Sequence, residues 1–135
     1  MVVIICLDND GGMRFNGRRQ SRDRLLIKDI TDACKGELFA ADYSAELFGE
    51  DGCQPILAEN PQTVMDKNGY YFAETLAPDF PYNEVKGYII YRWNRKYPAD
   101  ETFDFDLAQN GYRLCSVSEF AGSSHDKITK EVWTK

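Results

Sequence analysis

Five arginines gather in one short segment of a chain that is acidic elsewhere. Residues 13–30 read MRFNGRRQSRDRLLIKDI, and Asp23 supplies the only carboxylate among the arginines. Guanidinium groups beside the free N–H groups of a helix start form a good site for a phosphate or a carboxylate. The segment therefore predicts a ligand site in which Asp23 contacts an amino group of the ligand or acts as a catalytic acid. We expect the remaining contacts to come from Arg18, Arg19, Gln20, Ser21 and Arg22.

The same residues also allow a purely structural interpretation. Asp23 would then stabilise the dipole of the following helix, and the arginines would form ion pairs with the acidic remainder of the chain. Residues 14–28 hold six basic side chains against Asp23 alone, a local charge of +5, so the rest of the chain carries −11 within a net charge of −6. Such a chain repels nucleic acid at long range, which argues against general nucleic-acid binding. One basic patch can still hold a small anion or an acidic protein surface.

A second candidate site follows the longest predicted strand. Residues 91–100 read YRWNRKYPAD, and Arg92, Trp93 and Arg95 have side chains that stack against a flat ligand or a base. Alternation along the strand places Arg92 and Trp93 on opposite faces. The alternative is an aromatic core strand whose arginines pair with carboxylates of the acidic loop that follows, among them Asp100, Glu101 and Asp104.

The third candidate holds the only histidine. Residues 119–131 read EFAGSSHDKITKE, and the SSHD stretch at 123–126 contains the residue types of a hydrolytic triad. Consecutive neighbours cannot point at one another in the required hydrogen-bonded order, and the chain has no GxSxG motif. We therefore expect a turn in which the serines bond the backbone. With His125 as the only histidine, a zinc site with three or four convergent ligands is not expected, so no metal is predicted.

Length and composition favour one globular domain over residues 1–135. The chain is 43% hydrophobic and 13% aromatic, which is ordinary for a folded domain of this size. No apolar run reaches about 20 residues, so no membrane span is predicted, and the run at residues 2–7 lacks the basic flank of a signal peptide. The four cysteines are widely spaced and form no CxxC pair. These features predict a cytoplasmic protein with reduced thiols.

Strands are expected to alternate with helices in the first half of the chain and to follow one another in the second. Loops are expected at residues 8–20 and 97–106. Apolar runs predict strands at residues 2–7, 37–41, 54–59, 70–75, 85–95, 112–120 and 127–133. Ser21 is a suitable N-cap for a helix over 22–34 that Gly36 ends, and shorter helices are expected at 43–49 and 61–69. This order predicts an α/β three-layer domain with a mixed, mostly parallel sheet and antiparallel C-terminal strands.

The order of these elements resembles the dihydrofolate reductase fold. In that family a first strand leads into a glycine turn, as ICLDNDGGM (5–13) does here. A helix follows whose first turn carries a carboxylate that contacts the pterin, and Asp23 stands at nearly the same distance after the turn. The spacing of the family near the C-terminus is matched by ADETFDFD (99–106), Tyr112, VSEF (117–120) and KITKEVW (127–133). The resemblance covers most of the chain in outline and implies a dihydrofolate reductase-like fold.

The chain departs from that family at the residues that bind NADPH. The family holds the cofactor phosphates with a GRxT turn, and the counterpart ADYSAELFG (41–49) places Asp42 where the arginine belongs. A carboxylate repels a phosphate. A Gly-Gly pair should follow YYFA, and Glu74-Thr75 stands there instead, so the backbone cannot approach a pyrophosphate closely. We therefore expect no cofactor and no NADPH-dependent activity, with a divergent reductase that uses Asp23 as its acid as the alternative.

Three strings also resemble small bacterial proteins that sometimes carry a ribonuclease Z label: GMRFNGRRQSRD (12–23), YRWNRKYPAD (91–100) and EFAGSSHDKITKE (119–131). Ribonuclease Z needs a HxHxDH cluster and further histidines for its two metals, which one histidine cannot supply. The sequence instead predicts binding of a small anionic or nucleotide-like ligand, or of an acidic protein partner, through the region Arg18–Arg24. A pure interaction module without a ligand is the remaining possibility.

Overall fold

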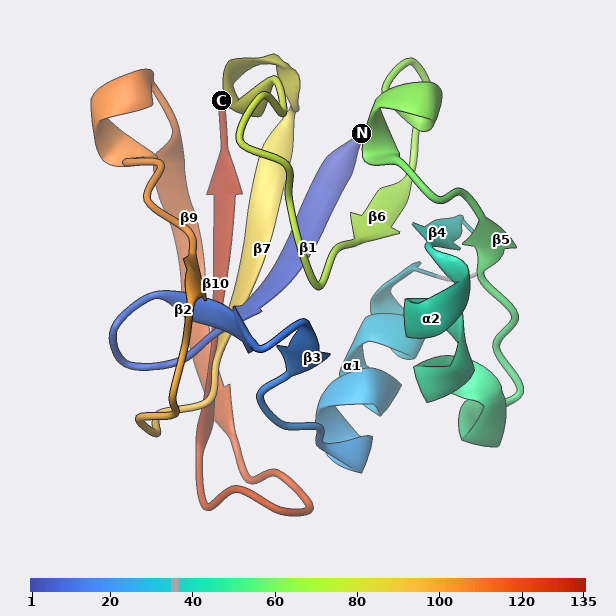
Figure 1. Ribbon diagram of the computed structural model, residues 1–135, viewed down its shortest axis with the longest axis vertical. Coiled ribbons are helices and arrows are strands. Elements are labelled where there is room, and N and C mark those ends of the chain that lie inside the picture. Colours follow the sequence, from blue (N-terminus) through green and yellow to red (C-terminus); the bar gives the residue numbers. More distant parts are fainter. Residues whose placement is uncertain (35–36) are drawn as a thin grey trace.

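Two sheets, of seven and three strands, form the framework of the chain (Figure 1). The computed structural model describes residues 1–34 and 37–135. Both chain termini lie at the upper end of the main sheet in Figure 1. The segment that holds the predicted ligand residues lies towards the opposite end.

Strand β1 (Val2–Leu7) runs through the middle of the main sheet. It pairs in parallel with β6 (Tyr70–Phe72) on one side and with β7 (Gly87–Arg92) on the other. Its continuous apolar, β-branched sequence suits a strand that is covered on both faces. Ile4 and Ile5 point to opposite faces, and both are completely buried.

Parallel strands extend the sheet beyond β6, and an antiparallel pair closes the other edge. The parallel strands are β4 (Leu38–Ala40) and β5 (Ile56–Leu57). The antiparallel pair consists of β10 (Ile128–Thr134), next to β7, and β9 (Arg113–Phe120) at the edge. The strand order is β5-β4-β6-β1-β7-β10-β9. The predicted α/β architecture, with a mostly parallel sheet and an antiparallel C-terminal pair, is confirmed.

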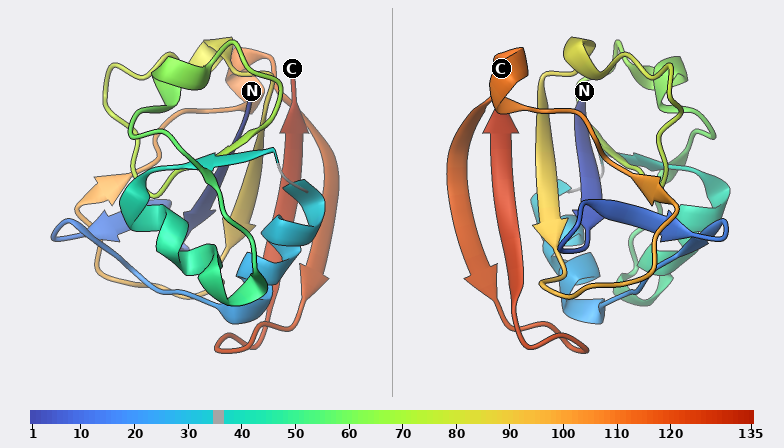
Figure 2. Two further views of the ribbon diagram at one scale, coloured as in Figure 1. Left: turned by 90° about the vertical axis from the view of Figure 1, so that its right-hand side faces the viewer. Right: turned by 60° about the vertical axis from the view of Figure 1, so that its left-hand side comes forward.

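Helix α1 (Arg24–Cys34) covers one face of this sheet together with two shorter helical elements (Figure 2, left). The shorter elements are α2 (Asp42–Ala45) and the 3₁₀ helix η1 (Glu46–Asp51). The buried stripe of α1, at the spacing of a single helix face, consists of Leu26, Ile27, Ile30 and Cys34. These side chains pack against the face of the sheet that carries Ile4.

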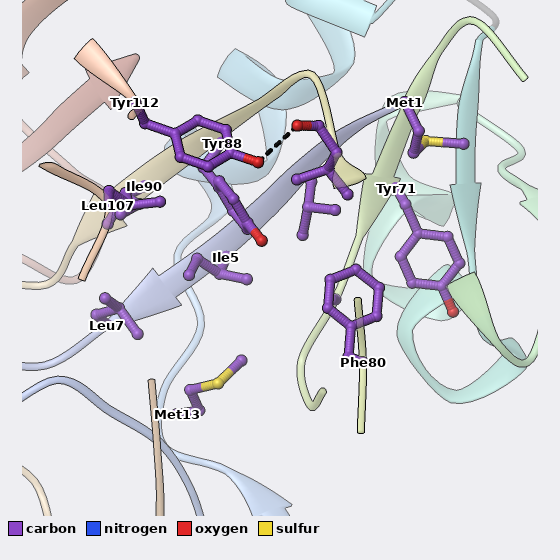
Figure 3. Close-up of a cluster of buried hydrophobic side chains, with 13 residues drawn as sticks. Met1, Ile5, Leu7, Met13, Tyr71, Phe80, Tyr88, Ile90, Leu107 and Tyr112 are labelled. Carbon is purple, nitrogen blue, oxygen red and sulfur yellow. Dashed lines mark hydrogen bonds between the residues drawn. The ribbon is translucent and has the colours of Figure 1, made fainter. Parts of the chain in front are cut away.

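Loops, short 3₁₀ turns and the three-stranded sheet cover the opposite face. The 3₁₀ turns there are η3 (Tyr82–Glu84) and η4 (Ala108–Asn110). Figure 3 shows the cluster of buried side chains on this face. Tyr88 of β7 and Tyr112, just before β9, lie side by side in it. The hydroxyl of Tyr112 donates to the carbonyl oxygen of Val85 at 2.6 Å, so this buried phenol is satisfied.

The small sheet lies where the sequence predicted only loops. It consists of β2 (Gly12–Phe15), β3 (Arg18–Arg19) and β8 (Glu101–Thr102). The loops expected at 8–20 and 97–106 are therefore wrong over these residues. Two-residue polar strands carry no periodicity, and β2 finds its partner β8 far along the chain, so no local pattern could indicate the pairing.

Helical predictions need two corrections. Helix α1 begins at Arg24, and its N-cap is Asp23 rather than Ser21, because Oδ1 of Asp23 accepts from the backbone N–H groups at the helix start. The helix expected at 61–69 is only the 3₁₀ turn η2 (Pro61–Val64), although Asn60 caps it as a helix cap would. The predicted end of α1 at Gly36 lies outside the described residues.

The four cysteine thiols are free: Cys6, Cys34, Cys53 and Cys115. In residues 1–34 and 37–135, no three histidine, cysteine or acidic side chains converge as metal ligands would. None of the helices described has the length and apolar composition needed to cross a membrane.

Candidate functional site

Asp23 is the residue around which the candidate site is built. Its Oδ1 caps α1 by accepting from the backbone N–H groups of Leu25 and Leu26, at 3.0 and 3.2 Å. The same carboxylate holds the connection between β9 and β10, because the backbone N–H groups of Ser123 and Ser124 donate to it, each at 2.9 Å. One buried side chain thus joins the start of α1 to a loop 100 residues further along the chain.

These hydrogen bonds decide the charge of Asp23. Burial alone would raise the pKa of its carboxyl group, whereas the N–H groups of Ser123 and Ser124 and the contact with His125 lower it. The net result is a pKa well below the ordinary value of 3.8. Asp23 is therefore ionised near neutral pH and accepts hydrogen bonds. Its surroundings lend no support to a role as a catalytic acid, which stays a prediction.

His125 continues the hydrogen-bonded chain away from Asp23. Its Nδ1 lies 3.0 Å from Oδ2 of Asp23, and its Nε2 lies 3.2 Å from the hydroxyl of Ser21 and 2.9 Å from that of Tyr97. Since the ionised carboxylate can only accept, Nδ1 carries a hydrogen, and in the neutral form of the ring Nε2 is the acceptor. The indole of Trp93 stacks on the imidazole, with 4.6 Å between ring centroids and 25° between planes. The ring is thereby fixed in both position and direction.

Gly122 lets the loop approach Asp23 this closely. Its N–H donates to the carbonyl oxygen of His125 at 2.9 Å, which closes a tight turn. A Cβ atom at Gly122 would collide with Oδ2 of Asp23 and would lie 2.9 Å from Cδ1 of Ile128. A residue without a side chain is therefore needed here.

The two serines of this loop bond the backbone, as the sequence predicted. Oγ of Ser123 accepts from the N–H of Arg24, and the hydroxyl of Ser124 donates to the carbonyl oxygen of Arg22, both at 2.9 Å. Both hydroxyls also contact the carboxylate of Asp23, at 3.2 and 3.3 Å. The loop and the start of α1 are therefore held by several polar contacts at once.

The arginines of residues 14–24 divide into two groups. Arg14 forms a bidentate ion pair with Glu101, at 2.7 and 3.0 Å, and Arg19 forms one with Glu74, at 2.7 and 2.8 Å. The structural interpretation accounts for these two. Three others are exposed and form no ion pair with any other described residue: Arg18, Arg22 and Arg24.

Two of these exposed arginines line an open cleft of about 390 Å³. Arg24 is the first residue of α1 and Arg22 lies just before it, whereas Glu46 and Glu50 come from η1. Like the arginines, these two glutamates form no ion pair within the described part of the chain. The cleft therefore presents both signs of charge.

A narrower cavity of about 20 Å³ adjoins the cleft. Ser21 and Trp93 lie in its lining beside apolar side chains of the sheet and of α1. The residues common to the two linings are Arg22, Asp23, Ile27 and Leu47. Ser21 thus faces the narrow cavity, while its neighbour Arg22 faces both.

Gln20 is tied to the end of β1. Its Nε2 donates to Oδ2 of Asp8 at 2.8 Å and to the carbonyl oxygen of Pro98 at 3.3 Å. Asp8 also accepts from the N–H groups of Asp10 and Gly12, at 2.8 and 2.7 Å. Burial alone would raise the pKa of Asp8, and these hydrogen bonds hold it below its ordinary value. Gln20 therefore positions the segment that leads to Ser21.

Arg92 is not brought together with the other predicted ligand residues. It pairs with Glu131 at 2.7 and 3.2 Å, on the sheet face that carries Ile90. Trp93 lies on the opposite face, 5% exposed, in the core beneath α1. The predicted joint contact of Arg92 and Trp93 with one ligand would require both faces of the sheet, and it stays a prediction without geometric support.

A third hollow, of about 360 Å³, lies at the carboxyl ends of β4, β5 and β6. Its lining contains Glu74, which is paired with Arg19, and Glu59, which has no cation partner in the described part of the chain. Its one arginine is Arg14, which is paired with Glu101. The backbone N–H of Asp42 donates to Glu59 at 3.0 Å. The hollow is acidic, in contrast to the cleft at the start of α1.

Comparison with known proteins identifies the fold. Comparisons with models of protein families and with curated protein sequences found no match. A dihydrofolate reductase from Enterococcus faecalis, complexed with NADP(H) and RAB-propyl, aligns over 98% of this chain and 94% of its own, with a TM-score of 0.68. This chain has a dihydrofolate reductase-like fold. The sequence identity is 9%, so the likeness concerns the fold alone, and the predicted resemblance is confirmed at that level.

The sequence did not place His125 and Tyr97, two members of the hydrogen-bonded chain, in the predicted ligand site. The SSHD stretch indicated the right chemistry, but besides its neighbour Ser124, at 3.3 Å from Nδ1, the partners of His125 include Asp23 and Ser21, more than 100 residues away. Tyr97 carried no signal of its own. The available clue was that the only histidine belongs to a predicted turn and the SRD stretch at 21–23 to a predicted helix start, both of which leave backbone N–H groups that need acceptors.

Proposed function

We propose that this dihydrofolate reductase-like chain binds a small nucleotide-like ligand in the cleft at the start of α1. The observation that carries this proposal is the pair Arg22 and Arg24, exposed in a cleft of about 390 Å³ and without an ion pair to any described residue. A volume of roughly 300–1,000 Å³ is typical of small-molecule sites. The planar guanidinium group is well suited to a phosphate or a carboxylate.

The carboxylates of the cleft favour one orientation of the bound ligand. Glu46 and Glu50 repel an anionic group and accept hydrogen bonds from amino groups, such as those of a nucleobase. Ile27 and Leu47 add apolar contacts between the two charged sides. A ligand with a phosphate at one end and an amino-substituted ring at the other matches this arrangement.

The residues present do not fit NADP(H), the cofactor that the fold family implies. The hollow at the ends of β4, β5 and β6 presents Glu59, which has no cation partner in the described part of the chain, and its single arginine is already paired with a carboxylate. A pyrophosphate placed there would meet negative charge. We therefore propose a function without NADPH-dependent reduction.

An acidic protein partner is the second candidate. Arg18 is exposed on the β2–β3 hairpin, where Phe15 is 49% exposed, so a cation and an aromatic ring lie on one protruding element. A partner on this hairpin would depend on Arg18, whereas a small ligand in the cleft would depend on Arg22 and Arg24.

Isothermal titration calorimetry with adenosine monophosphate, adenosine and NADPH tests the proposal. We expect the monophosphate to bind, adenosine to bind at least about tenfold more weakly, and NADPH not to bind. Replacing Arg22 and Arg24 by Glu should abolish the binding, whereas the matched control Arg18→Glu should not. Absence of any binding of the monophosphate to the unmodified chain, or equal binding by the double variant, would show that the cleft is not this site.

A further inference from the structure

The hydrogen-bonded chain of Asp23, His125 and Ser21 has the order of groups that activates a serine hydroxyl. Oδ2 of Asp23 lies 3.0 Å from Nδ1 of His125, and Nε2 of His125 lies 3.2 Å from Oγ of Ser21. The carboxylate fixes the hydrogen on Nδ1, so the lone pair of Nε2 faces the serine. We propose that Ser21 is a nucleophile with His125 as its general base, and that the chain hydrolyses esters of small acyl groups.

Asp23 and Trp93 hold the imidazole of His125 in the orientation that a general base for Ser21 needs. The side chains of Asp23 and His125 are 0% and 1% exposed, and Trp93 stacks on the ring. Asp23 would not touch the substrate, so it is a positioning residue that keeps the ring in one tautomer and orientation. Ser21 is only partly buried and lines a cavity, so its hydroxyl is the exposed end of the chain.

Tyr97 shares the lone pair of Nε2 in the resting state. Its hydroxyl lies 2.9 Å from Nε2, closer than that of Ser21. Only one donor at a time can transfer a proton to this nitrogen. Tyr97 therefore competes with Ser21, and removing its hydroxyl should make Ser21 more reactive.

The narrow cavity limits the acyl group to a small one. About 20 Å³ is room for a group the size of a water molecule or a methyl group. An acetyl group over Ser21 would place its methyl in this cavity and its leaving group in the larger cleft, which Arg22 links to the cavity. The guanidinium of Arg22 would lie near the carbonyl oxygen and stabilise its developing negative charge.

The reaction proceeds in two balanced halves. Oγ of Ser21 forms a bond to the carbonyl carbon as its proton passes to Nε2 of His125. The bond to the leaving alkoxide then breaks, and the alkoxide takes this proton. A water molecule next attacks the acyl-serine, giving one proton to Nε2, and the released Oγ recovers that proton as the carboxylic acid departs. No oxidant, metal or cofactor takes part.

Hydrolysis of p-nitrophenyl acetate and labelling by a fluorophosphonate, located by mass spectrometry, test this inference. We expect one adduct on the peptide that contains Ser21, and a fall in hydrolysis of about 10²-fold in Ser21→Ala. The matched control Ser118→Ala, an exposed serine on β9, should keep the unmodified rate and adduct. p-Nitrophenyl acetate should be preferred over the butyrate ester by about tenfold or more.

The result that overturns the inference is equally definite. Unchanged hydrolysis by a folded Ser21→Ala variant, or an adduct on another residue, means that Ser21 is not the nucleophile. Tyr97→Phe gives a second, independent readout, since faster labelling of Ser21 supports the competition at Nε2 and slower labelling contradicts it. Both ester substrates lack the anionic group on which nucleotide binding depends. Ester hydrolysis can therefore be absent from a chain that binds the nucleotide, and it can be present in a chain that does not.

Discussion

The carboxylate of Asp23 lies 3.0 Å from Nδ1 of His125 although 102 residues separate them in the chain. This contact joins the start of α1 to the β9–β10 loop, which Figure 1 shows at the end of the sheet away from the chain termini. The same carboxylate caps α1 and accepts the backbone N–H groups of the loop. Whatever ligand the cleft takes, its two walls at this end depend on one buried side chain.

Replacing Asp23 by Ala should destabilise the chain by about 3 kcal/mol, because it removes a helix cap and leaves buried N–H groups without acceptors. Urea unfolding followed by circular dichroism measures the loss. The exposed Asp126, in the same loop, is the matched control, and Asp126→Ala should change the free energy of unfolding by less than about 0.5 kcal/mol. An Asp23→Ala variant as stable as the unmodified chain would contradict the structural role derived for this carboxylate.

Stability should fall on acidification, partly through the same residue. The pKa of Asp23 in the folded chain lies below its ordinary value of 3.8, so the unfolded chain takes up the proton first as the pH decreases. The stabilisation is therefore complete above the ordinary pKa and is lost as the pH falls through it towards the lower folded value. Urea unfolding between about pH 5 and pH 2 should show the difference between the unmodified chain and Asp23→Ala shrinking. A difference that grows on acidification would have the wrong sign.

The sequence predicted the elements that local patterns determine and missed those that distant pairing determines. The apolar runs of β1 and β7 are visible because burial on both faces needs continuous apolar residues. The pair β2–β8 joins polar residues such as Arg14 and Glu101, which no local periodicity distinguishes from a loop. At the site, the predicted arginines, Ser21 and Asp23 come from one segment, whereas His125 and its partner Tyr97 come from two others, and no spacing rule connects the three segments.

Replacing Gly122 by Ala should cost about 2 kcal/mol, because the added Cβ would collide with the carboxylate of Asp23 and force the loop or α1 to move. Thermal unfolding measures the effect. Gly49→Ala is the matched control, since a Cβ there would meet no atom within 4 Å and its φ is not positive, so the change should be within about 0.5 kcal/mol. Equal stability of the two variants would mean that the loop has room which the structure does not provide.

The partly buried ion pair of Arg19 and Glu74 should show a strong coupling in a double-mutant cycle. The two side chains are 19% and 10% exposed, make two short hydrogen bonds, and lie beside Ser44 and Tyr43, which bind the carboxylate and the guanidinium. Replacing either partner alone leaves an unpaired charge in a poorly solvated place. Each single variant should therefore lose more than half of the unfolding free energy that the double variant loses. We expect a coupling free energy of about 2 kcal/mol from urea unfolding of Arg19→Ala, Glu74→Ala and the double variant.

The exposed pair Lys28 and Asp32 on α1 provides the matched comparison for that cycle. Its side chains are 59% and 66% exposed and 3.3 Å apart, at i and i+4 of the helix. Solvent screens such a pair, and its coupling should be no more than about 0.5 kcal/mol. A coupling for Arg19 and Glu74 as small as this would mean that their contact is also well solvated. The segment between β3 and α1 would then be held to the sheet mainly by Gln20 and Asp23 and not by the arginine.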